Sequence, residues 1–235
     1  MILPAQAPRQ FGARNKGDVV DIKVDYKVRR GATFLGRGRF TNAFRHRNDV
    51  FLFTHFGDYS KDILSSARHR LASPHLPNIE RIQILDGPPR ADWDIRVYRS
   101  DFYRTPISKP KPDLIKPSVR KRMLESWNMA RELQTIRVSA HFIDNNTRML
   151  DSGRCTDINY YVANEAKVTD EMSEALLELA ERAADYGDNY LFDDFRPRNL
   201  GLDRYGRLVI LDAFFDAKII NEDIIERERK AQQRR

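Results

Sequence analysis

The sequence contains one cysteine, Cys155, among 235 residues. A single thiol excludes an internal disulfide and any metal site built from several cysteines. No apolar run approaches the roughly 20 residues that a membrane-spanning helix needs. The first residues, MILPAQAPRQFGARNKGD, lack both the basic start and the continuous apolar stretch of a secretory signal. These absences favour a reducing intracellular setting, and we expect a cytoplasmic protein with no membrane partner.

Acidic residues are scarce in two stretches of a chain whose net charge is +7. Between residues 104 and 122 seven positive side chains accompany Asp113 alone, and the last ten residues hold five positive side chains and two negative ones. A basic flank can attract nucleic acid or an acidic protein surface. The plainer alternative, which we favour, is a solvated linker and a solvated tail, because no aromatic residues alternate with these charges.

The hydrophobic share of 41% is typical of a folded globular chain. Residues 1–17 carry prolines and glycines without periodicity and are predicted to form a flexible arm. Residues 18–104 are predicted to form a strand-rich lobe, because apolar and polar residues alternate in short runs there. The predicted strands are Val19–Val28, Phe34–Phe40 with a glycine turn inside it, Val50–Phe53, Ile79–Leu85 and Ile95–Tyr98. One helix, Lys61–Leu71, is predicted in this lobe, with Ser60 as its N-cap.

Four prolines interrupt residues 105–117, which predicts an irregular basic connection. Beyond it, residues 118–216 predict a mainly helical lobe with helices at Ser118–Thr135 and Thr169–Tyr186, followed by a charged tail over residues 217–235. The second helix has apolar residues at helical spacing that predict one buried face: Met172, Ala175, Leu176, Leu179 and Ala183. Leucine-rich segments at 200–202 and 208–211 predict a hairpin. The fold class is therefore α+β, and we expect a ligand to bind between the two lobes.

The polar segment before and after this hairpin carries groups suited to phosphoryl transfer. Asp194 can receive or orient an acceptor hydroxyl, and Arg196 can stabilise charge on the transferring group. Asn199 and Asp212, thirteen residues apart, can supply hard oxygen ligands to magnesium. The alternative is that these residues, together with Asp193, are ordinary turn and strand-end residues.

The segment Asp194-Phe195-Arg196-Pro197-Arg198-Asn199 resembles the catalytic-loop motif Asp-Leu-Lys-Pro-x-Asn of serine/threonine protein kinases. Asp212-Ala213-Phe214 is placed where those kinases have Asp-Phe-Gly. Leu76-Pro77-Asn78-Ile79 is similar to the segment that follows the regulatory helix of kinases, and Leu35–Phe44 is similar to their glycine-rich loop. The resemblance implies that nucleotide phosphates contact six residues of that loop: Gly36, Arg37, Gly38, Arg39, Phe40 and Ala43.

This resemblance implies a two-lobed protein-kinase-like fold, with a strand-rich N-lobe and an abbreviated, mainly helical C-lobe. It implies ATP and Mg²⁺ as ligands, with Asn199 and Asp212 on the metal, and transfer to serine or threonine of a protein. The size also resembles that of the small kinase-like proteins of tailed bacteriophages. That likeness implies action on proteins of a bacterial host, by phosphorylation or by binding the transcription machinery.

Four departures from the kinase pattern limit what it implies. The strand Val50–Phe53 carries no lysine to hold the phosphates, and the following helix has Asp62 in place of any glutamate. Phe192 and Asp193 replace the histidine and arginine that precede the catalytic aspartate. The chain also continues for only about twenty residues after Asp212, without an activation segment.

Two interpretations stay open on these departures. An arginine of the glycine-rich region, Arg37 or Arg39, or Arg45 on the next strand, can replace the missing lysine, as in the with-no-lysine kinases. Alternatively, the protein is a pseudokinase that binds a host protein without turnover.

Overall fold

The computed structural model describes residues 11–12, 21–22, 32–37, 41–54, 59–85, 94–105, 107, 117–136, 154–218 and 229. The chain divides into two compact units. Unit 1 comprises residues 1–62 and 78–102, and unit 2 comprises residues 63–77 and 103–235. Of the predicted strand at Val19–Val28, the structure describes only β2 (Asp21–Ile22), which pairs with β1 (Phe11–Gly12). The remainder of that prediction lies outside the described residues.

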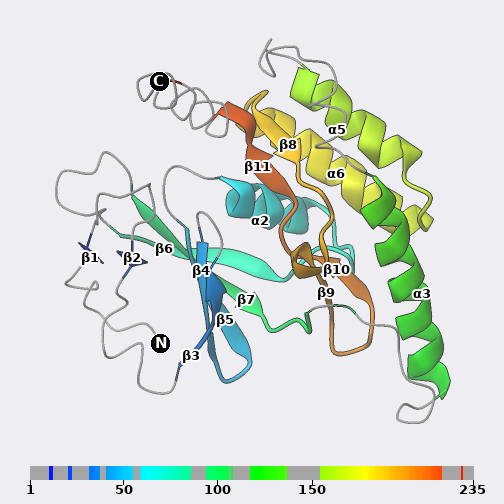
Figure 1. Cartoon of the computed structure of the whole chain (residues 1–235), viewed down its shortest axis with the longest axis horizontal. Helices are drawn as coiled ribbons and strands as arrows, with labels where there is room; N and C mark the ends of the chain where they lie inside the picture. The colour runs from blue at the N-terminus through cyan, green and yellow to red at the C-terminus, as the bar shows by residue number, and fades with distance from the viewer. Residues whose placement is uncertain are drawn as a thin grey trace. The chain divides into compact units, whose positions relative to one another are not determined.

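Unit 1 is built on a five-stranded antiparallel sheet with the order β3-β4-β5-β7-β6. Its strands are β3 (Thr33–Arg37), β4 (Thr41–His46), β5 (Asp49–Thr54), β6 (Ile79–Leu85) and β7 (Ile95–Asp101). The chain forms the first three strands in order, passes through α2 (Ser60–Arg70), and returns to the far edge before β7 fills the gap (Figure 1).

Apolar residues of the central strands form the core of unit 1. Val50, Phe51 and Phe53 of β5 are buried, as the β-branched and aromatic run predicted. The Phe53 ring meets Phe44 of β4 edge-on, with centroids 5.7 Å apart. On β7, Val97 and Tyr98 are completely buried. Because side chains on both faces of β5 are buried, its apolar residues follow one another without polar residues between them.

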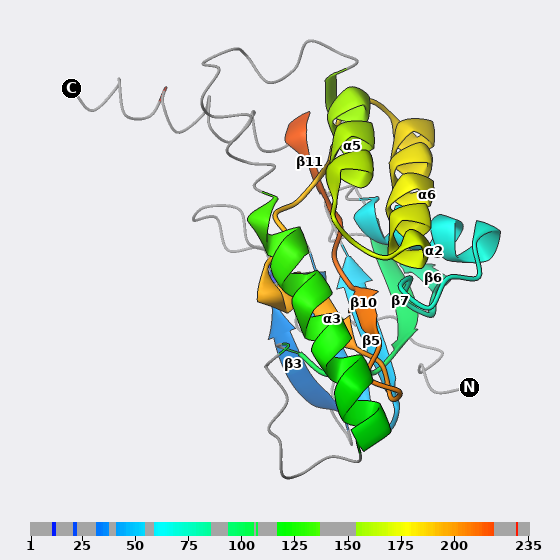
Figure 2. The same ribbon diagram turned by 90° about the vertical axis from the view of Figure 1, so that its right-hand side faces the viewer.

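Besides residues 63–70 of α2, unit 2 contains the helices α3 (Pro117–Thr135), α5 (Arg154–Glu165) and α6 (Asp170–Tyr186). Its short strands form two pairs: β8 (Tyr190–Phe192) with β11 (Phe214–Asp216), and β9 (Leu200–Leu202) with β10 (Leu208–Ile210). Helices α5 and α6 lie side by side, and α3 runs along the β9–β10 hairpin (Figure 2). None of the described helices is both long and apolar enough to cross a membrane.

The predicted helices of unit 2 are confirmed with small changes at their ends. Helix α6 begins after Thr169 and ends before Gly187, whose φ of 125° suits glycine. All five residues predicted for its apolar face are buried, and Ala180 joins them. Helix α5 was not predicted, because its sequence RCTDINYYVANE has weak apolar periodicity. The antiparallel sheet of unit 1 and the helices of unit 2 confirm the predicted α+β class, with a strand-rich N-terminal part and a mainly helical C-terminal part.

Candidate active site

The loop after β8 carries the predicted catalytic residues of unit 2. β8 pairs with β11 on one edge, and Asp193 continues that pairing by donating its N–H to the Ala213 carbonyl at 2.8 Å. The other edge of β8 is satisfied by the buried side chain of Asn159 in α5. Its Nδ2 donates to the Tyr190 carbonyl, and its Oδ1 accepts from the Phe192 N–H, each at 2.8 Å. The loop therefore starts from a strand held on both edges.

Asp193 is the centre of the hydrogen bonds inside this loop. Its Oδ1 accepts the N–H of Asp194 at 2.8 Å, and its Oδ2 accepts from Asn199 Nδ2 at 3.0 Å. Burial raises the pKa of the Asp193 carboxyl, and the negative charge of Asp212 raises it further. No catalytic or binding role was expected for Asp193. Its position next to Asp194 in the sequence indicates that it belongs to the same loop, but the spacing does not predict its bond to Asn199.

Asn199 joins the loop to the segment that precedes Asp212. The Asn199 side chain is buried, and its Nδ2 also donates to the Asp194 carbonyl at 3.3 Å. Its own carbonyl accepts the N–H groups of Leu211 and Asp212, at 2.8 and 3.2 Å. Asn199 thus contacts the backbone of both Asp194 and Asp212. Because Nδ2 makes both side-chain bonds, Oδ1 is the amide atom suited to a metal.

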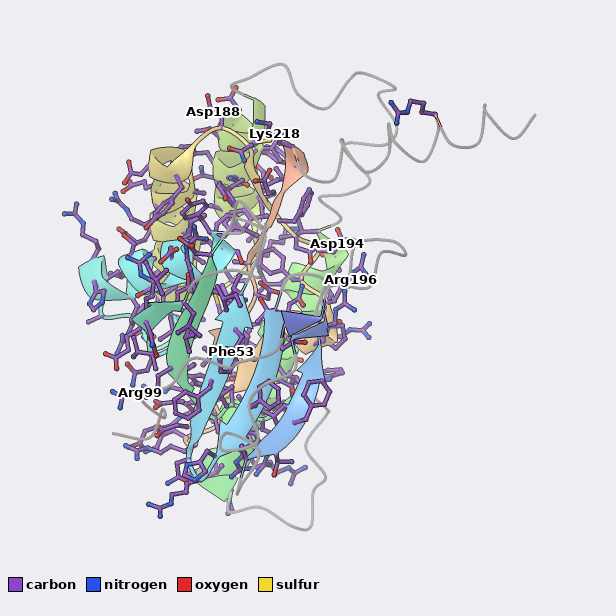
Figure 3. The ribbon with its side chains drawn as sticks, turned by 90° about the vertical axis from the view of Figure 1, so that its left-hand side faces the viewer. Phe53, Arg99, Asp188, Asp194, Arg196 and Lys218 are labelled. Carbon is purple, nitrogen blue, oxygen red and sulfur yellow. The ribbon has the colours of Figure 1, made fainter. Side chains whose placement is uncertain are left out.

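Asp194 and Arg196 form an ion pair at the surface of the loop. The carboxylate Oδ2 of Asp194 lies 3.6 Å from the Arg196 guanidinium, and the two side chains are 22% and 52% exposed. Figure 3 shows the two side chains close together on the same part of the ribbon. Pro197 begins the 3₁₀ turn η1 (Pro197–Asn199) that follows, and its fixed φ favours this turn. The carboxylate of Asp193 serves the loop itself, whereas that of Asp194 is partly open to solvent.

The rings of Phe192, Phe195 and Phe214 pack together next to the loop. Phe192 stacks on Phe214 with centroids 4.7 Å apart, and it contacts Phe195 at 5.7 Å. Phe195 is 1% exposed. The phenylalanine that replaces the kinase histidine therefore packs on the aromatic residue of Asp212-Ala213-Phe214. Aromatic pairs of this kind add about 0.5–1.5 kcal/mol beyond their burial.

The predicted phosphate-binding turn of unit 1 is described in part. Gly36 and Arg37 end β3, and Gly36 pairs with Ala43 of β4 next to a β-bulge. Gly38, Arg39 and Phe40 lie outside the described residues, as does the side chain of Arg37. A Cβ at Gly36 would meet nothing within 4 Å. Packing inside the chain therefore does not require glycine at this position.

Helix α2 and the sheet of unit 1 are joined by a different ion pair from that of kinases. Asp62, whose side chain is 6% exposed, lies 3.0 Å from Arg81 Nη1 on β6 and 3.7 Å from Arg96 Nε on β7. Arg45, one candidate for replacing the lysine, lies over the Phe102 ring and donates to the Arg47 carbonyl at 2.8 Å. The carboxylate of the helix therefore pairs with arginines of the neighbouring strands.

The donor set of the loop suits magnesium better than a transition metal. Within the described ranges, no group of three or more His, Cys, Asp or Glu side chains could hold a metal ion. Magnesium needs fewer protein ligands, because it keeps waters and binds one or two carboxylates together with substrate phosphates. Asn199 Oδ1 and the Asp212 carboxylate supply oxygen ligands of this type.

Among known proteins, similarities are found to solved structures. No protein-family model matches the chain, and no curated protein matches it either. A solved structure of a thermostable mutant of aminoglycoside phosphotransferase APH(4)-Ia, in ternary complex with ADP and hygromycin B, is 14% identical, with 81% of this chain and 71% of that chain covered and a TM-score of 0.32. Choline kinase LicA from Streptococcus pneumoniae is 15% identical, with coverage of 79% and 65% and a TM-score of 0.25. Both TM-scores are low, so neither similarity supports an argument about this chain.

Proposed function

We propose that the protein is a phosphotransferase that binds ATP with Mg²⁺ and transfers the γ-phosphoryl group to a hydroxyl. The observation that carries this proposal is the Asn199 cluster, in which one side chain and its carbonyl connect Asp193, Asp194 and Asp212. A turn or a strand end needs no buried amide that bonds the Asp193 carboxylate and the Asp194 carbonyl while its own carbonyl accepts the Asp212 N–H. The acceptor we propose is serine or threonine of a protein, in line with the sequence resemblance.

Each residue of the cluster has a distinct task in this proposal. Asp194 orients the acceptor hydroxyl and takes its proton as the bond from oxygen to the γ-phosphorus forms and the bond to ADP breaks. Asp193 fixes the rotamer of Asn199, so that Oδ1 and the Asp212 carboxylate would hold magnesium when it binds. The bound metal neutralises charge on the phosphate oxygens. Arg196 exchanges its partner Asp194 for the transferring group, which suits the long ion-pair distance of 3.6 Å.

The glycine turn in unit 1 supports nucleotide binding independently of the cluster. Gly36 has open space where a side chain would stand, so its lack of a side chain serves no internal packing. Close approach of the backbone to a phosphate is the usual reason for glycine at such a turn. We propose that Gly36, Arg37, Gly38, Arg39, Phe40 and Ala43 contact the phosphates, as the sequence resemblance implies.

Two measurements test this proposal. Thermal unfolding with ATP and Mg²⁺ at about ten times the dissociation constant should show about 1.4 kcal/mol of stabilisation, or an increase in Tm of about 3–6 °C. Transfer of labelled γ-phosphate to a protein acceptor should fall at least 100-fold in Asp194→Asn and Asp212→Asn. Asp157→Asn, which removes an exposed carboxylate from α5 in the same unit, should keep full transfer. A folded protein that shows no shift with millimolar nucleotide would refute nucleotide binding.

A second candidate function is nucleotide binding without turnover. It is favoured by β5, which has no lysine, and by Asp62, whose carboxylate pairs with Arg81 and Arg96. In this case the protein acts as a pseudokinase by binding another protein, such as the transcription machinery of a bacterial host. An increase in Tm with ATP and Mg²⁺ that persists alongside undetectable phosphate transfer would select this candidate over the first.

A further inference from the structure

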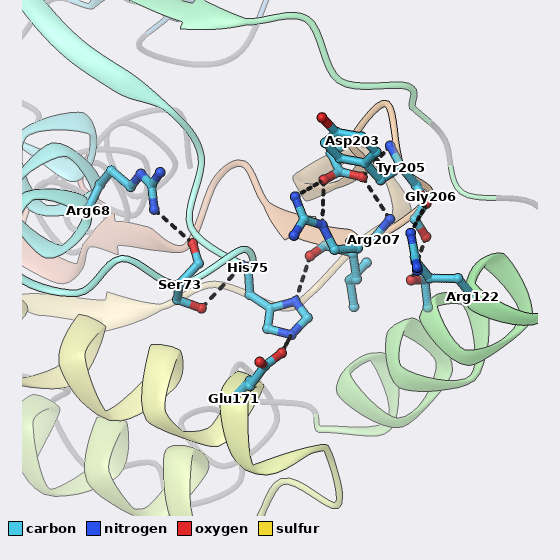
Figure 4. Close-up of polar contacts among 11 residues, drawn as sticks. Arg68, Ser73, His75, Arg122, Glu171, Asp203, Tyr205, Gly206 and Arg207 are labelled. Carbon is cyan, nitrogen blue, oxygen red and sulfur yellow. Dashed lines mark hydrogen bonds and ion pairs between the residues drawn. The ribbon is translucent and has the colours of Figure 1, made fainter. Parts of the chain in front are cut away.

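Positive side chains gather where α3 meets the β9–β10 hairpin of unit 2. We call this surface the basic patch, and it comprises four arginines and Tyr205: Arg104, Arg122, Arg204, Tyr205 and Arg207. All are exposed except Arg207, which is partly exposed. The patch joins segments about eighty residues apart in the sequence, and the close-up in Figure 4 shows Arg122, Tyr205 and Arg207 near one another.

Packing between α3 and the hairpin turn holds the patch together. Ser126 Oγ donates to the Gly206 carbonyl at 2.8 Å, and this contact is buried. Gly206 has a φ of 81°, and a Cβ there would lie 2.8 Å from Met123 Cγ, so the turn approaches the helix as closely as glycine allows. Arg122 Nη1 donates to the Tyr205 carbonyl at 3.3 Å. The helix and the hairpin therefore present their cations as one surface.

The patch has little negative charge of its own. Asp203 accepts the N–H groups of Tyr205 and Arg207 and pairs with the Arg207 guanidinium at 2.7 Å, so its carboxylate serves the turn. Helix α3 has no acidic residue in its first turn, although negative charge is favoured at that end of a helix. Among the described residues, Arg104, Arg122 and Arg204 form no ion pair. The positive charge is thus available to an external anion.

An exposed aromatic ring lies within this positive surface. The Tyr205 side chain is 45% exposed. The guanidinium carbons of Arg204 and Arg207 lie 4.7 and 5.1 Å from its ring centroid. Sequence analysis found no aromatic residue among the charges of residues 104–122, because this ring comes from the distant hairpin. Cations around an accessible ring are what proteins use to bind single strands of nucleic acid, through phosphates and a stacked base.

We propose that the basic patch binds single-stranded nucleic acid, with the cations on successive phosphates and Tyr205 stacked on a base. An acidic peptide would use the same cations but would have no need of the ring, and for this reason we favour nucleic acid. This inference goes beyond the proposed phosphotransferase activity and does not depend on it, since the patch shares no residue with the Asn199 cluster.

Fluorescence anisotropy of the full chain with labelled 20-nucleotide strands tests the proposal. One measurement uses oligo-U RNA and the other uses oligo-dT DNA, so that the two affinities distinguish RNA from DNA as the ligand. With about four phosphates neutralised, the slope of log affinity against log salt is about −3, so binding weakens about 50-fold between 50 and 200 mM salt. In Arg122→Gln with Arg204→Gln the same change in salt should weaken binding only about sevenfold. Tyr205→Leu should weaken binding about fivefold or more at fixed salt.

A matched variant removes the same charge elsewhere on unit 2. Arg70→Gln with Arg131→Gln alters two exposed arginines outside the patch, and its affinity should stay within about twofold of the parent chain. Circular dichroism and the Tm of every variant verify that it is folded. Equal loss in the control and the patch variants, or no oligonucleotide binding by the parent chain at 50 mM salt, would overturn the proposal. Patch-dependent binding of poly-glutamate in place of either oligonucleotide would instead assign the surface to an acidic protein.

Discussion

Replacing Asn159 with leucine should destabilise the protein through the strand that leads into the catalytic loop. The Asn159 side chain is completely buried, and it supplies both a donor and an acceptor to the free edge of β8. Leucine has a similar volume and offers neither. The variant therefore leaves the Tyr190 carbonyl and the Phe192 N–H without partners, while changing the packing little.

The size of this effect follows from the two orphaned groups. A buried donor or acceptor that loses its partner costs about 1–3 kcal/mol, so two groups cost about 2–6 kcal/mol. Domains of this kind are stable by about 5–15 kcal/mol, and we expect the variant to fold with reduced stability. Asn159→Asp keeps the acceptor but places a carboxylate against the Tyr190 carbonyl, so its cost at pH 7 should equal or exceed that of leucine.

Urea unfolding followed by circular dichroism at pH 7 measures these differences. The matched control is Asn164→Leu on the same helix, because the Asn164 side chain is exposed and bonds only the Tyr160 carbonyl of its own helix. Its free energy of unfolding should change by less than about 0.5 kcal/mol. If Asn159→Leu changed the free energy of unfolding no more than this control does, the side chain would not hold β8, and the account of the loop's support would be wrong.

Two further predictions concern buried ionisable groups. Burial lowers the pKa of His75, whose Nδ1 lies 2.7 Å from the Leu208 carbonyl, so the unfolded chain binds the proton more readily and the free energy of unfolding should fall as pH drops below about 6.5. Urea titrations from pH 7 to 5 should show a smaller loss in His75→Asn than in the parent chain, and equal losses would contradict this role. Asp62→Ala should cost about 3 kcal/mol, because a buried carboxylate is removed from Arg81 and Arg96. Glu80→Ala, which breaks the exposed pair with Arg99, should cost under about 1 kcal/mol in the same unfolding assay. If Asp62→Ala and Glu80→Ala lowered the free energy of unfolding equally, burial would not be what makes the Asp62 ion pairs stabilising.

Local sequence patterns predicted the elements whose burial repeats regularly. The apolar face of α6 and the apolar run of β5 each follow from spacing alone, and both are buried in the structure. Helix α5 escaped prediction because Asn159, Tyr160 and Tyr161 interrupt its apolar periodicity. Asn159 is polar because it bonds β8, about thirty residues later. A contact of this range leaves no trace in a local pattern.

The loop after β8 shows the same difference: the residues of the motif were predicted, whereas the contacts between its side chains were not. Spacing predicted Asp194, Asn199 and Asp212 as site residues, because the kinase motif that they resemble has a fixed type and order of residues. Asp193 was overlooked, since its importance is a bond to Asn199 across a turn. Tyr205 was overlooked for a similar reason, because it joins the basic residues of α3 only through the fold.

The departures from the kinase pattern do not carry equal weight once their surroundings are known. At Phe192 and Asp193 the substituted side chains make new local contacts, a stacked ring on Phe214 and a bond to Asn199, so the loop keeps its geometry. At Asp62 the carboxylate pairs with Arg81 and Arg96, and no lysine of β5 takes part. The replacements at Phe192 and Asp193 are therefore compatible with phosphate transfer. The absence of a lysine on β5 that pairs with the helix carboxylate is the departure that bears on transfer. Whether the proposed activity includes turnover depends on the cation that meets the phosphates, and variants of Arg37 and Arg39 in the transfer assay address that point most directly. Loss of transfer with Tm still raised by ATP and Mg²⁺ would show that one of them has taken the place of the lysine.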